Sequence, residues 1–421
     1  LGDGGAIYLV ESGYSYGEVF TRPRLVEIAR DGRGVIREIA SGRHAPWNGV
    51  AFAGGALYVA QGGQLEGGRV VRFDLDGGAR VLVDDLPSTG DHHTSGPVIG
   101  RDGWIYFGQG TATNAGVVGT DNHDYGWLAR RPRFHDVPCR DVTLRGANFE
   151  TGDPLTPEPG DRAVTGAYVP FGTATRRGQV IPGRVPCSGA ILRVHPEGSA
   201  VELVAWGFRN PFGLAVAPDG RLYATENGFD VRGSRPVFGA ADPLWRVEPG
   251  RWYGWPDFAE GRPLTIDFYA EGGGAPRGFL LAEHPGRPPE PVAYLAVHSS
   301  AGGLDFSRDA AFGRTGDAFV ALFGDMAPET GKVMSPVGFK VVRVNPETGV
   351  IEDFARNGGD KNGPASLVGG GGLERPIAAR FDRSGRELYV VDFGVLRMTD
   401  AGPVPQPETG VLWRITREAA R

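Results

Sequence analysis

Apolar and polar residues alternate along this chain in a unit that recurs six times. In each copy a tight, glycine-containing turn leads into a short apolar and aromatic strand, at residues 3–11, 54–60, 102–108, 219–224, 316–321 and 385–391. A second strand, in which apolar residues alternate with arginine or another polar residue, follows at residues 24–28, 69–73, 190–194, 244–247, 339–344 and 411–415. A two-residue period of this kind indicates a strand with one face in water.

A third type of strand, small and apolar, precedes most of these units at residues 48–52, 95–99, 212–216, 302–306 and 376–379. Its glycine and alanine residues suit the crowded innermost position around a central channel. About four strands per unit, repeated six times, predict an all-β, six-bladed β-propeller with four-stranded antiparallel blades and long capping loops. The first unit shows no innermost strand, and we expect that strand to lie upstream of Leu1 or the blade to be closed by other means.

The units are unevenly spaced, which predicts one propeller domain over residues 1–421 with two loop insertions, at about 109–188 and about 257–298. Loops of this length in a compact domain are usually functional or disordered. We interpret the first insertion as an ordered cap over one mouth of the propeller, with a disordered insert as the alternative. It contains both cysteines, Cys139 and Cys187, which we expect to form a disulfide. Two free thiols are the alternative.

Composition narrows the class of protein further. The chain has 44 lysine and arginine residues against 50 aspartate and glutamate residues, a formal net charge of −6, so nothing predicts a nucleic-acid-binding surface. No run of 18 apolar residues predicts a membrane span. The 68 glycines and 33 prolines suit many short strands joined by turns.

Candidate chemistry lies at the starts of the predicted innermost strands. His93 directly precedes the innermost strand of the third unit, and Arg209 takes the equivalent place in the fourth. A base and a cation at the same channel mouth suit an oxidation, because the cation stabilises developing negative charge while the base accepts a proton. A solvated loop histidine and an arginine that ties loop carbonyls together are the alternatives. The oxygen-rich residues 226–230 suit calcium, and Arg375 precedes the sixth innermost strand as a further cation.

Three motifs carry a resemblance to a known family: His93-Thr94-Ser95-Gly96, Gly-Phe-Arg-Asn-Pro-Phe-Gly-Leu-Ala at 207–215, and Tyr-Gly-Trp-Pro at 253–256. In these stretches the chain resembles the soluble glucose/sorbosone dehydrogenases, six-bladed propellers that use pyrroloquinoline quinone (PQQ) and calcium. The resemblance implies a periplasmic or secreted dehydrogenase that oxidises a sugar, sugar alcohol or aldehyde. It would pass electrons to a soluble acceptor or a separate cytochrome, since the chain has no haem motif.

The resemblance also implies roles for individual residues. His93 resembles the general base that takes the hydroxyl proton while hydride passes to the quinone, and Arg209 the arginine at the reactive quinone oxygen. The implied cofactor-binding residues are Asn210 and Arg375, and the implied calcium ligands are Gly228, Phe229 and Asp230.

The chain departs from the family's pattern at several places. Gln109 stands in the region of the aspartate that orients the base, and we assign it to cofactor binding. Lys332 substitutes from a loop for a lysine expected on the fifth blade. Beside the substrate, Asn48 is kept, whereas Trp47 stands where the family has glutamine. Two other functions therefore stay open, a calcium-dependent, lactonase-like propeller hydrolase and a non-catalytic propeller that binds glycans or proteins.

Overall fold

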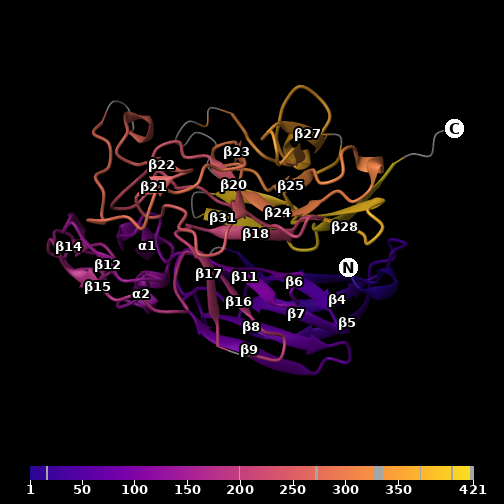
Figure 1. Cartoon of the computed structure of the whole chain (residues 1–421), viewed down its shortest axis with the longest axis horizontal. Helices are drawn as coiled ribbons and strands as arrows, with labels where there is room; N and C mark the ends of the chain where they lie inside the picture. The colour runs from indigo at the N-terminus through magenta and orange to yellow at the C-terminus, as the bar shows by residue number, and fades with distance from the viewer. Residues whose placement is uncertain are drawn as a thin grey trace.

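The computed structural model describes residues 1–15, 18–198, 200–270, 274–325, 333, 335–369, 371–399 and 402–417. Almost all of its regular structure is antiparallel β-sheet, and six sheets follow one another along the chain as the blades of a propeller (Figure 1). The six-bladed β-propeller predicted from the repeated unit is thereby confirmed.

Blades two to five each contain four strands in simple sequence order, from the innermost strand outward. Blade two consists of β6 (Trp47–Ala53), β7 (Ala56–Gln61), β8 (Gly68–Asp74) and β9 (Ala79–Leu86). Blade three consists of β10 (Thr94–Ile99), β11 (Ile105–Gln109), β16 (Ala190–Val194) and β17 (Glu202–Trp206). Blade four consists of β18 (Pro211–Val216), β19 (Leu222–Glu226), β20 (Asp242–Val247) and β23 (Ala293–Leu295). Blade five consists of β24 (Ala301–Phe306), β25 (Ala318–Leu322), β26 (Lys340–Val344) and β27 (Ile351–Arg356).

Blades one and six have three strands each within the described residues. Blade one consists of β1 (Ile7–Glu11), β4 (Arg24–Ile28) and β5 (Val35–Ser41), and blade six of β28 (Pro376–Phe381), β29 (Glu387–Asp392) and β32 (Val411–Thr416). In blade one, β1 pairs directly with β4, as the second strands of the other blades pair with their third strands. This pairing agrees with the assignment of residues 3–11 to the second strand of the unit.

Apolar side chains of neighbouring blades meet in shared clusters and hold the ring together. Blades four and five share a cluster that includes Leu244, Leu304, Phe306 and Val320. Blades two and three share another that includes Tyr58, Val70, Phe107 and Leu192. Because each sheet is covered by the next, the alternating pattern of the strands places apolar residues between blades.

The two insertions lie together on the left in Figure 1 and form one cap. The first insertion, between β11 and β16, contains α1 (Thr120–Asp124), α2 (Trp127–Arg130) and the paired strands β12 (Val142–Thr143) with β15 (Val180–Ile181) and β13 (Asn148–Gly152) with β14 (Arg162–Gly166). The second, between β20 and β23, contains β21 (Phe258–Ala259), β22 (Arg262–Pro263) and the 3-10 helix η2 (Asp267–Tyr269). The remaining short elements are β2 (Tyr14–Ser15), β3 (Glu18–Val19), β30 (Leu396–Thr399), β31 (Gly402–Pro405), α3 (Ala365–Val368), η1 (Asp3–Gly5) and η3 (Ala310–Phe312).

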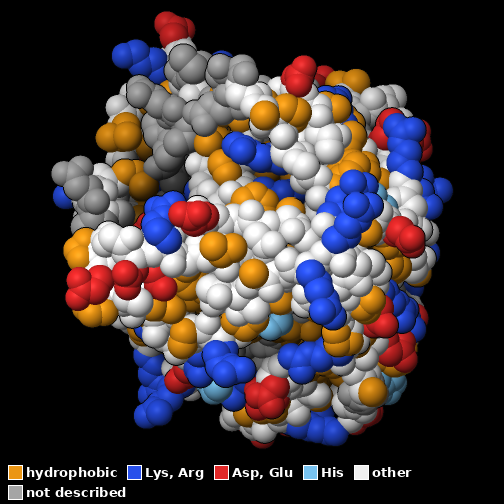
Figure 2. All heavy atoms as spheres, turned by 90° about the vertical axis from the view of Figure 1, so that its left-hand side faces the viewer, with side chains coloured by type: hydrophobic (Ala, Val, Ile, Leu, Met, Phe, Trp, Pro, Cys, Tyr) orange, Lys and Arg blue, Asp and Glu red, His pale blue; other side chains and the backbone are white. Residues whose placement is uncertain are grey.

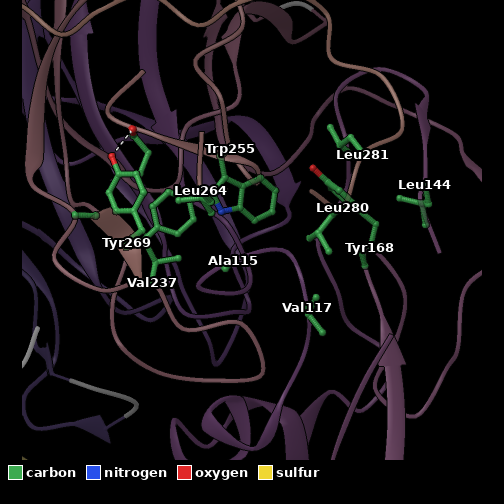
Figure 3. Packing of buried hydrophobic residues seen from close by; sticks show 14 of the residues in the cluster. Ala115, Val117, Leu144, Tyr168, Val237, Trp255, Leu264, Tyr269, Leu280 and Leu281 are labelled. Atoms are coloured by element: carbon green, nitrogen blue, oxygen red, sulfur yellow. Dashed lines mark hydrogen bonds between the residues drawn. The ribbon is translucent and has the colours of Figure 1, made fainter. Parts of the chain in front are cut away.

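A separate hydrophobic core unites the two insertions (Figure 3). Tyr168 and Val117 come from the first insertion, Trp255 and Leu280 from the second, and all four are nearly inaccessible to solvent. The face of the molecule that carries this cap shows basic, acidic and apolar side chains intermixed (Figure 2). The ordered cap that we expected is therefore built from both insertions.

Two buried polar contacts reinforce the cap. The expected disulfide between Cys139 and Cys187 is present and closes the stem of the first insertion. The Arg235 guanidinium pairs with Asp257 at 2.9 Å, and both side chains are almost fully buried. Asp257 also accepts hydrogen bonds from the backbone N–H groups of Leu280 and Leu281.

An arginine joins three blades toward the opposite end of the innermost strands. The guanidinium of Arg380, near the end of β28, donates to the carbonyl oxygen of Leu304 in blade five and to that of Leu214 in blade four, the latter at 3.4 Å. None of the helices in the described residues is long and apolar enough to span a membrane.

Candidate functional site

The cap lies at the mouth where the innermost strands start. The strands of each blade are antiparallel, so β11 ends, and the first insertion begins, at the edge where β10 starts. The Gly110 N–H donates to the His93 carbonyl across this edge at 3.1 Å. The predicted chemical residues are therefore close to the base of the cap.

His92 and Arg209 meet at Thr111. The Nδ1 atom of His92 lies 2.9 Å from the Thr111 carbonyl oxygen, and the Thr111 N–H donates to the Arg209 carbonyl at 2.9 Å. His92 is 8% exposed and Arg209 is 2% exposed. Burial, followed by the charges of Arg209 and Arg232, holds the pKa of His92 well below its usual value. The imidazole is therefore neutral at pH 7.

The guanidinium of Arg209 is held from three directions. Its Nη2 lies 2.6 Å from Oδ2 of Asp230, its Nε donates to Asn114 Oδ1 at 3.1 Å, and its Nη1 donates to the Asn227 carbonyl at 3.2 Å. The backbone N–H of Arg209 donates to the Glu226 carboxylate, whose pKa burial raises to about 7. Because Asn114 belongs to the cap, cap and propeller together fix the orientation of this arginine.

A second arginine, Arg232, extends the cluster toward the cap. It contacts Asp91 at 2.7 Å, Asp121 at 2.6 Å and Asp230 at 3.0 Å, and its guanidinium lies over the Tyr125 ring at 4.6 Å. Burial raises the pKa of Asp121 to about 6 despite the nearby guanidinium. Arg232 therefore joins blade four to helix α1 and to the segment that precedes β10.

Asp230 is the carboxylate shared by the two arginines. Burial acts to raise its pKa, but the charges of Arg209 and Arg232 more than offset burial, so the pKa lies well below its usual value. The carboxylate is therefore ionised at every pH at which the protein would be assayed. With Asp91 and Asp121, three carboxylates face two guanidinium groups here.

His93 points to the other side of the same segment, toward blades one and two. Its ring contacts Tyr14 edge-on, with centroids 5.4 Å apart. A side chain at Gly63 would come within 2.7 Å of the His93 ring, so only glycine leaves room for it. Burial lowers the pKa of His93 to about 4. Its Nε2 is buried and has no hydrogen-bond partner in the described part of the chain.

Comparison with known proteins finds a family match for the segment that contains Arg209. Residues 182–321 match the sequence model of the family described as "Glucose / Sorbosone dehydrogenase". The chain resembles the glucose/sorbosone dehydrogenases. The sequence prediction of this resemblance is thereby confirmed over that segment. No curated protein matches the chain in a sequence search.

Solved structures agree with the fold. A glucose dehydrogenase structure is similar to this chain with a TM-score of 0.53 at 16% identity over 94% of this chain and 91% of that one. A second structure, also titled glucose dehydrogenase, has a TM-score of 0.52 at 16% identity, over 94% of this chain and 91% of that one. A structure titled putative oxidoreductase (glucose dehydrogenase), from Thermus thermophilus, has a TM-score of 0.48 at 19% identity, over 93% of this chain and 88% of that one. At 16% identity, the likeness to the two structures titled glucose dehydrogenase shows the propeller fold alone.

Two residues assigned from the glucose/sorbosone dehydrogenase pattern lie in the interior. Gln109 is fully buried; its Oε1 accepts hydrogen bonds from Ser88 and Thr94, and its Nε2 donates to the carbonyls of Pro87 and Gly110. Trp47 is 3% exposed and packs against Phe73. Their side-chain contacts are thus with the protein's own interior.

Other predicted residues line the mouth. The Asn48 amide donates to the Thr94 carbonyl at 3.0 Å, and the Asn210 amide donates to Asn227 Oδ1 at 2.9 Å. Arg375 donates to the carbonyls of Gly324 and Asp325 and lies over the rings of Phe323 and Phe339. Lys332 lies outside the described residues.

The segment predicted to bind calcium follows β19 directly. The Gly228 N–H donates to Asp242 at 2.8 Å, and Phe229 packs in the core of the cap. Within the described residues, the carbonyl oxygens of Gly228 and Phe229 accept no hydrogen bond. Among the described residues, no group of three or more His, Cys, Asp or Glu side chains could hold a metal ion.

Sequence reasoning missed His92, Arg232 and His298 as members of this site. His298 lies three residues before β24, at the start of the innermost strand of blade five, so its place resembles those of Arg209 and Arg375. Comparison of all blade starts would have found it. The place of Arg232 in the cluster depends on cap residues distant in sequence, which no local pattern indicates.

Proposed function

We propose that the protein is a PQQ- and calcium-dependent dehydrogenase that oxidises a sugar, sugar alcohol or aldehyde. The observation that carries the proposal is the juxtaposition of His92 and Arg209 around Thr111, at the starts of adjacent innermost strands, with His93 on the opposite side of the same segment. The match of residues 182–321 to the glucose/sorbosone dehydrogenase family supports the same reaction class. Two solved structures titled glucose dehydrogenase share the propeller fold.

The residues at the mouth suit an anionic, planar cofactor. PQQ carries carboxylates, and Arg375 is a cation at this mouth. The guanidinium of Arg209, already paired with Asp230, and the amide of the adjacent Asn210 would act as oriented hydrogen-bond donors. The buried Nε2 of His93, which has no hydrogen-bond partner in the described residues, fits a site completed by a ligand. When bound, PQQ with calcium would supply a hydride acceptor and a Lewis acid.

The chain's own residues would position the substrate and move the proton. His93 is neutral at pH 7 because its pKa is about 4, so its Nε2 can accept a proton from a substrate hydroxyl. The contacts of Arg209 with Asp230, Asn114 and Asn227 hold its guanidinium in place before any ligand arrives. Such preorganised cations stabilise negative charge that develops during reaction. Asn48 and Trp47 remain the proposed substrate-binding residues.

The proposed calcium ligands are the carbonyl oxygens of Gly228 and Phe229, together with Asp230. Oxygen donors of this kind suit calcium. Asp230 is already paired with two guanidinium groups, so its share in binding the ion would be smaller than that of the carbonyls. Gln109 and Lys332 remain proposed cofactor-binding residues.

The proposed partners follow from the same chemistry. The substrate is a small molecule, and the electrons pass to a soluble acceptor or a separate cytochrome. The Cys139–Cys187 disulfide supports a periplasmic or secreted location, because disulfides persist in oxidising compartments.

The direct test is reconstitution with PQQ and calcium chloride, followed by reduction of an artificial electron-accepting dye with a panel of sugars and aldehydes. We expect dye reduction that requires both additions. Arg209→Lys should lower kcat/KM by about 100-fold, because lysine cannot reproduce the planar contacts of guanidinium. Arg221→Lys, at an exposed arginine on the far edge of blade four, is the matched control. Absence of PQQ uptake by the wild-type protein in calorimetry would refute the proposal.

A further inference from the structure

Blades one and six are neighbours in the ring, and each has three strands within the described residues. Blade one has its second, third and outermost strands, because β1 pairs with β4 and β4 pairs with β5. Blade six has its innermost, second and third strands, because β28 pairs with β29 and β29 pairs with β32. In this part of the chain, the inner edge of β1 and the outer edge of β32 are therefore unpaired.

Residues along both edges are exposed where the corresponding strands of other blades are buried. Of the five residues of β1, only Ile7 is buried, whereas β7 and β25, the second strands of blades two and five, are buried throughout. No residue of β32 is buried, whereas β20, the third strand of blade four, is buried at all but one position. Both edges can therefore accept a further strand.

The turn before β1 determines where such a strand would run. The Gly2 N–H donates to the Ala6 carbonyl at 2.8 Å. In blade four the Ala217 N–H donates to the Arg221 carbonyl, also at 2.8 Å, in the turn that joins the innermost strand β18 to β19. Leu1 therefore takes the place of the last residue of β18, so chain that leads into Leu1 would occupy the innermost position of blade one.

Backbone groups of β1 face this innermost position. Groups point alternately to the two sides of an antiparallel strand, so those of Tyr8 and Val10 face the same side as the Ala6 carbonyl. In blade four the residue that corresponds to Tyr8 is Tyr223, which is opposite Ala215 of β18. Main-chain hydrogen bonds to an added strand would satisfy Tyr8 and Val10 in the same way.

There is space beside this position. A cavity of about 420 Å³ opens between the two blades, lined by Leu1 and Gly2 of blade one and by Ser384 and Tyr389 of blade six. The next strand of the inner ring, β6, is also poorly shielded. Only one of its seven residues is buried, whereas β24 in blade five is buried throughout.

Chain order connects the two unpaired edges. In every other pair of neighbouring blades, the outermost strand of one blade leads into the innermost strand of the next: β5 into β6, β9 into β10, β17 into β18, β23 into β24 and β27 into β28. By the same order, an outermost strand on blade six would lead into an innermost strand on blade one. One continuous segment can therefore pair with both edges.

We propose that a segment directly preceding Leu1 in the full-length protein closes the ring by pairing first with β32 and then with β1. Its first strand is the outermost strand of blade six, and its second is the innermost strand of blade one, which ends at Leu1. Two strands of about five to six residues and a connection of about five residues suffice. The order of the blades and the turn at Gly2 favour this occupant over a second copy of the chain.

The same segment would complete the mouth of the candidate site. The connections between neighbouring blades lie at this mouth, and four of them carry residues of the site, namely His92 and His93, Arg209, His298 and Arg375. The connection from blade six to blade one is the sixth of this kind. It would lie between the starts of β28 and β6.

Hydrogen exchange tests the proposal with two proteins, one that begins at Leu1 and one that keeps the natural residues before Leu1. We expect the N–H groups of Tyr8 and Val10 to exchange at least about 100-fold more slowly in the longer protein, because paired inner strands open rarely. The same direction is expected for β32. Tyr223, which is paired in both proteins, is the internal control. Replacing the residues before Leu1 by an equal number of glycines and serines should restore fast exchange.

Disulfide formation in the longer protein tests the register, also where the shorter protein does not fold. If Leu1 is opposite Ile7, as Val216 is opposite Leu222, the second residue before Leu1 is opposite Leu9. A cysteine there should cross-link with Leu9→Cys under mild oxidation. A cysteine directly before Leu1 lies on the other face of the strand and should not cross-link with Leu9→Cys.

Four results would overturn the proposal. The first is equal exchange of Tyr8 in the longer and shorter proteins, and the second is a natural protein that begins at Leu1. The third is protection of Tyr8 in the shorter protein that increases with protein concentration, which would assign the edge to a second copy of the chain. The fourth is a cross-link to Leu9→Cys from neither cysteine position, or equally from both.

Discussion

The disulfide between Cys139 and Cys187 should stabilise the protein substantially by restricting the unfolded chain. The two cysteines are 48 residues apart in sequence. The chain-entropy relation for a closed loop of this length gives a stabilisation of about 4 kcal/mol at 25 °C. For a chain of 421 residues, with an unfolding entropy of roughly 2.1 cal/mol/K per residue, this corresponds to a drop in Tm of about 4–5 °C.

The perturbation is the double variant Cys139→Ala/Cys187→Ala, measured by urea unfolding beside the wild type. Both cysteines are almost fully buried, but alanine preserves the surrounding packing of Phe107 and Leu192 better than a polar residue would. Wild type in a thiol reductant is the control, since it should approach the stability of the double variant. The double variant itself should not respond to the reductant.

The structure also predicts that activity is affected less than stability. The stem of the cap is closed independently by Asp136, which accepts hydrogen bonds from the Ala112 N–H and the Thr113 hydroxyl, each at 2.6 Å, and by paired bonds between Val137 and Ser188. These contacts should keep Asn114 against Arg209 without the disulfide. A loss of stability below about 1 kcal/mol would refute the loop-entropy reasoning and show that the polar contacts alone close the stem.

Three further predictions concern the proton acceptor, a buried acid and a buried ion pair. His93→Asn should lower kcat by roughly 100- to 10,000-fold if this histidine is the base, whereas His92→Asn should lower kcat by a smaller factor. A larger loss of kcat in His92→Asn would indicate that His92 is the base. Because the pKa of His93 is about 4, its protonation should not lower kcat/KM near pH 6.5. Glu226 and Asp121 titrate close to that pH, so an acid limb near pH 6.5 that persists in Glu226→Gln and in Asp121→Asn would contradict the assignment. Burial raises the pKa of Asp136 to about 7, so the folded state binds its proton more tightly than the unfolded state, and this contribution to stability is lost as pH rises from about 4 to about 7. As the pH rises over that range, the free energy of unfolding of Asp136→Asn should therefore increase relative to that of wild type, by up to about 1.4 kcal/mol per pH unit. A difference between the two proteins that does not change with pH would refute the raised pKa of Asp136. Arg235→Met should destabilise the protein by roughly 3–5 kcal/mol, because it leaves the carboxylate of Asp257 buried without its guanidinium; a loss under 1 kcal/mol in urea unfolding would show that backbone N–H donors suffice.

The blades could be predicted from sequence because their signal is local and repeated. Each innermost strand begins where its small apolar segment begins, and each second strand follows a glycine turn, so one pattern applied six times located the sheets. The cap was harder to predict. Its core joins Val117 and Tyr168 to Trp255 and Leu280, and no periodicity links segments so far apart in sequence.

The sequence predicted only those site residues whose place follows from their position before an innermost strand. Arg209 and the histidine pair could be placed at one mouth because both precede innermost strands. Their partners could not be predicted, because Asn114 reaches Arg209 from the cap. Which of the two adjacent histidines faces Arg209 could also not be predicted from the sequence. Successive side chains at a strand start point to opposite sides, so a shift of one residue exchanges their surroundings.

The pairing of Arg209 with Asp230 determines what kind of ligand the mouth can bind. If Arg209 were free, any anion would be attracted to it, and selectivity would be low. Asp230, Asp91 and Asp121 together offset the charges of that guanidinium and of Arg232, so a carboxylate ligand gains little from net charge at this point and must be recognised through other contacts, such as those of Arg375. The carboxylate of Asp230 also lies 3.6 Å from Nδ1 of His298 in blade five. Asp230 therefore links the starts of two innermost strands and limits how strongly an anion is attracted to the blade-four side of the mouth.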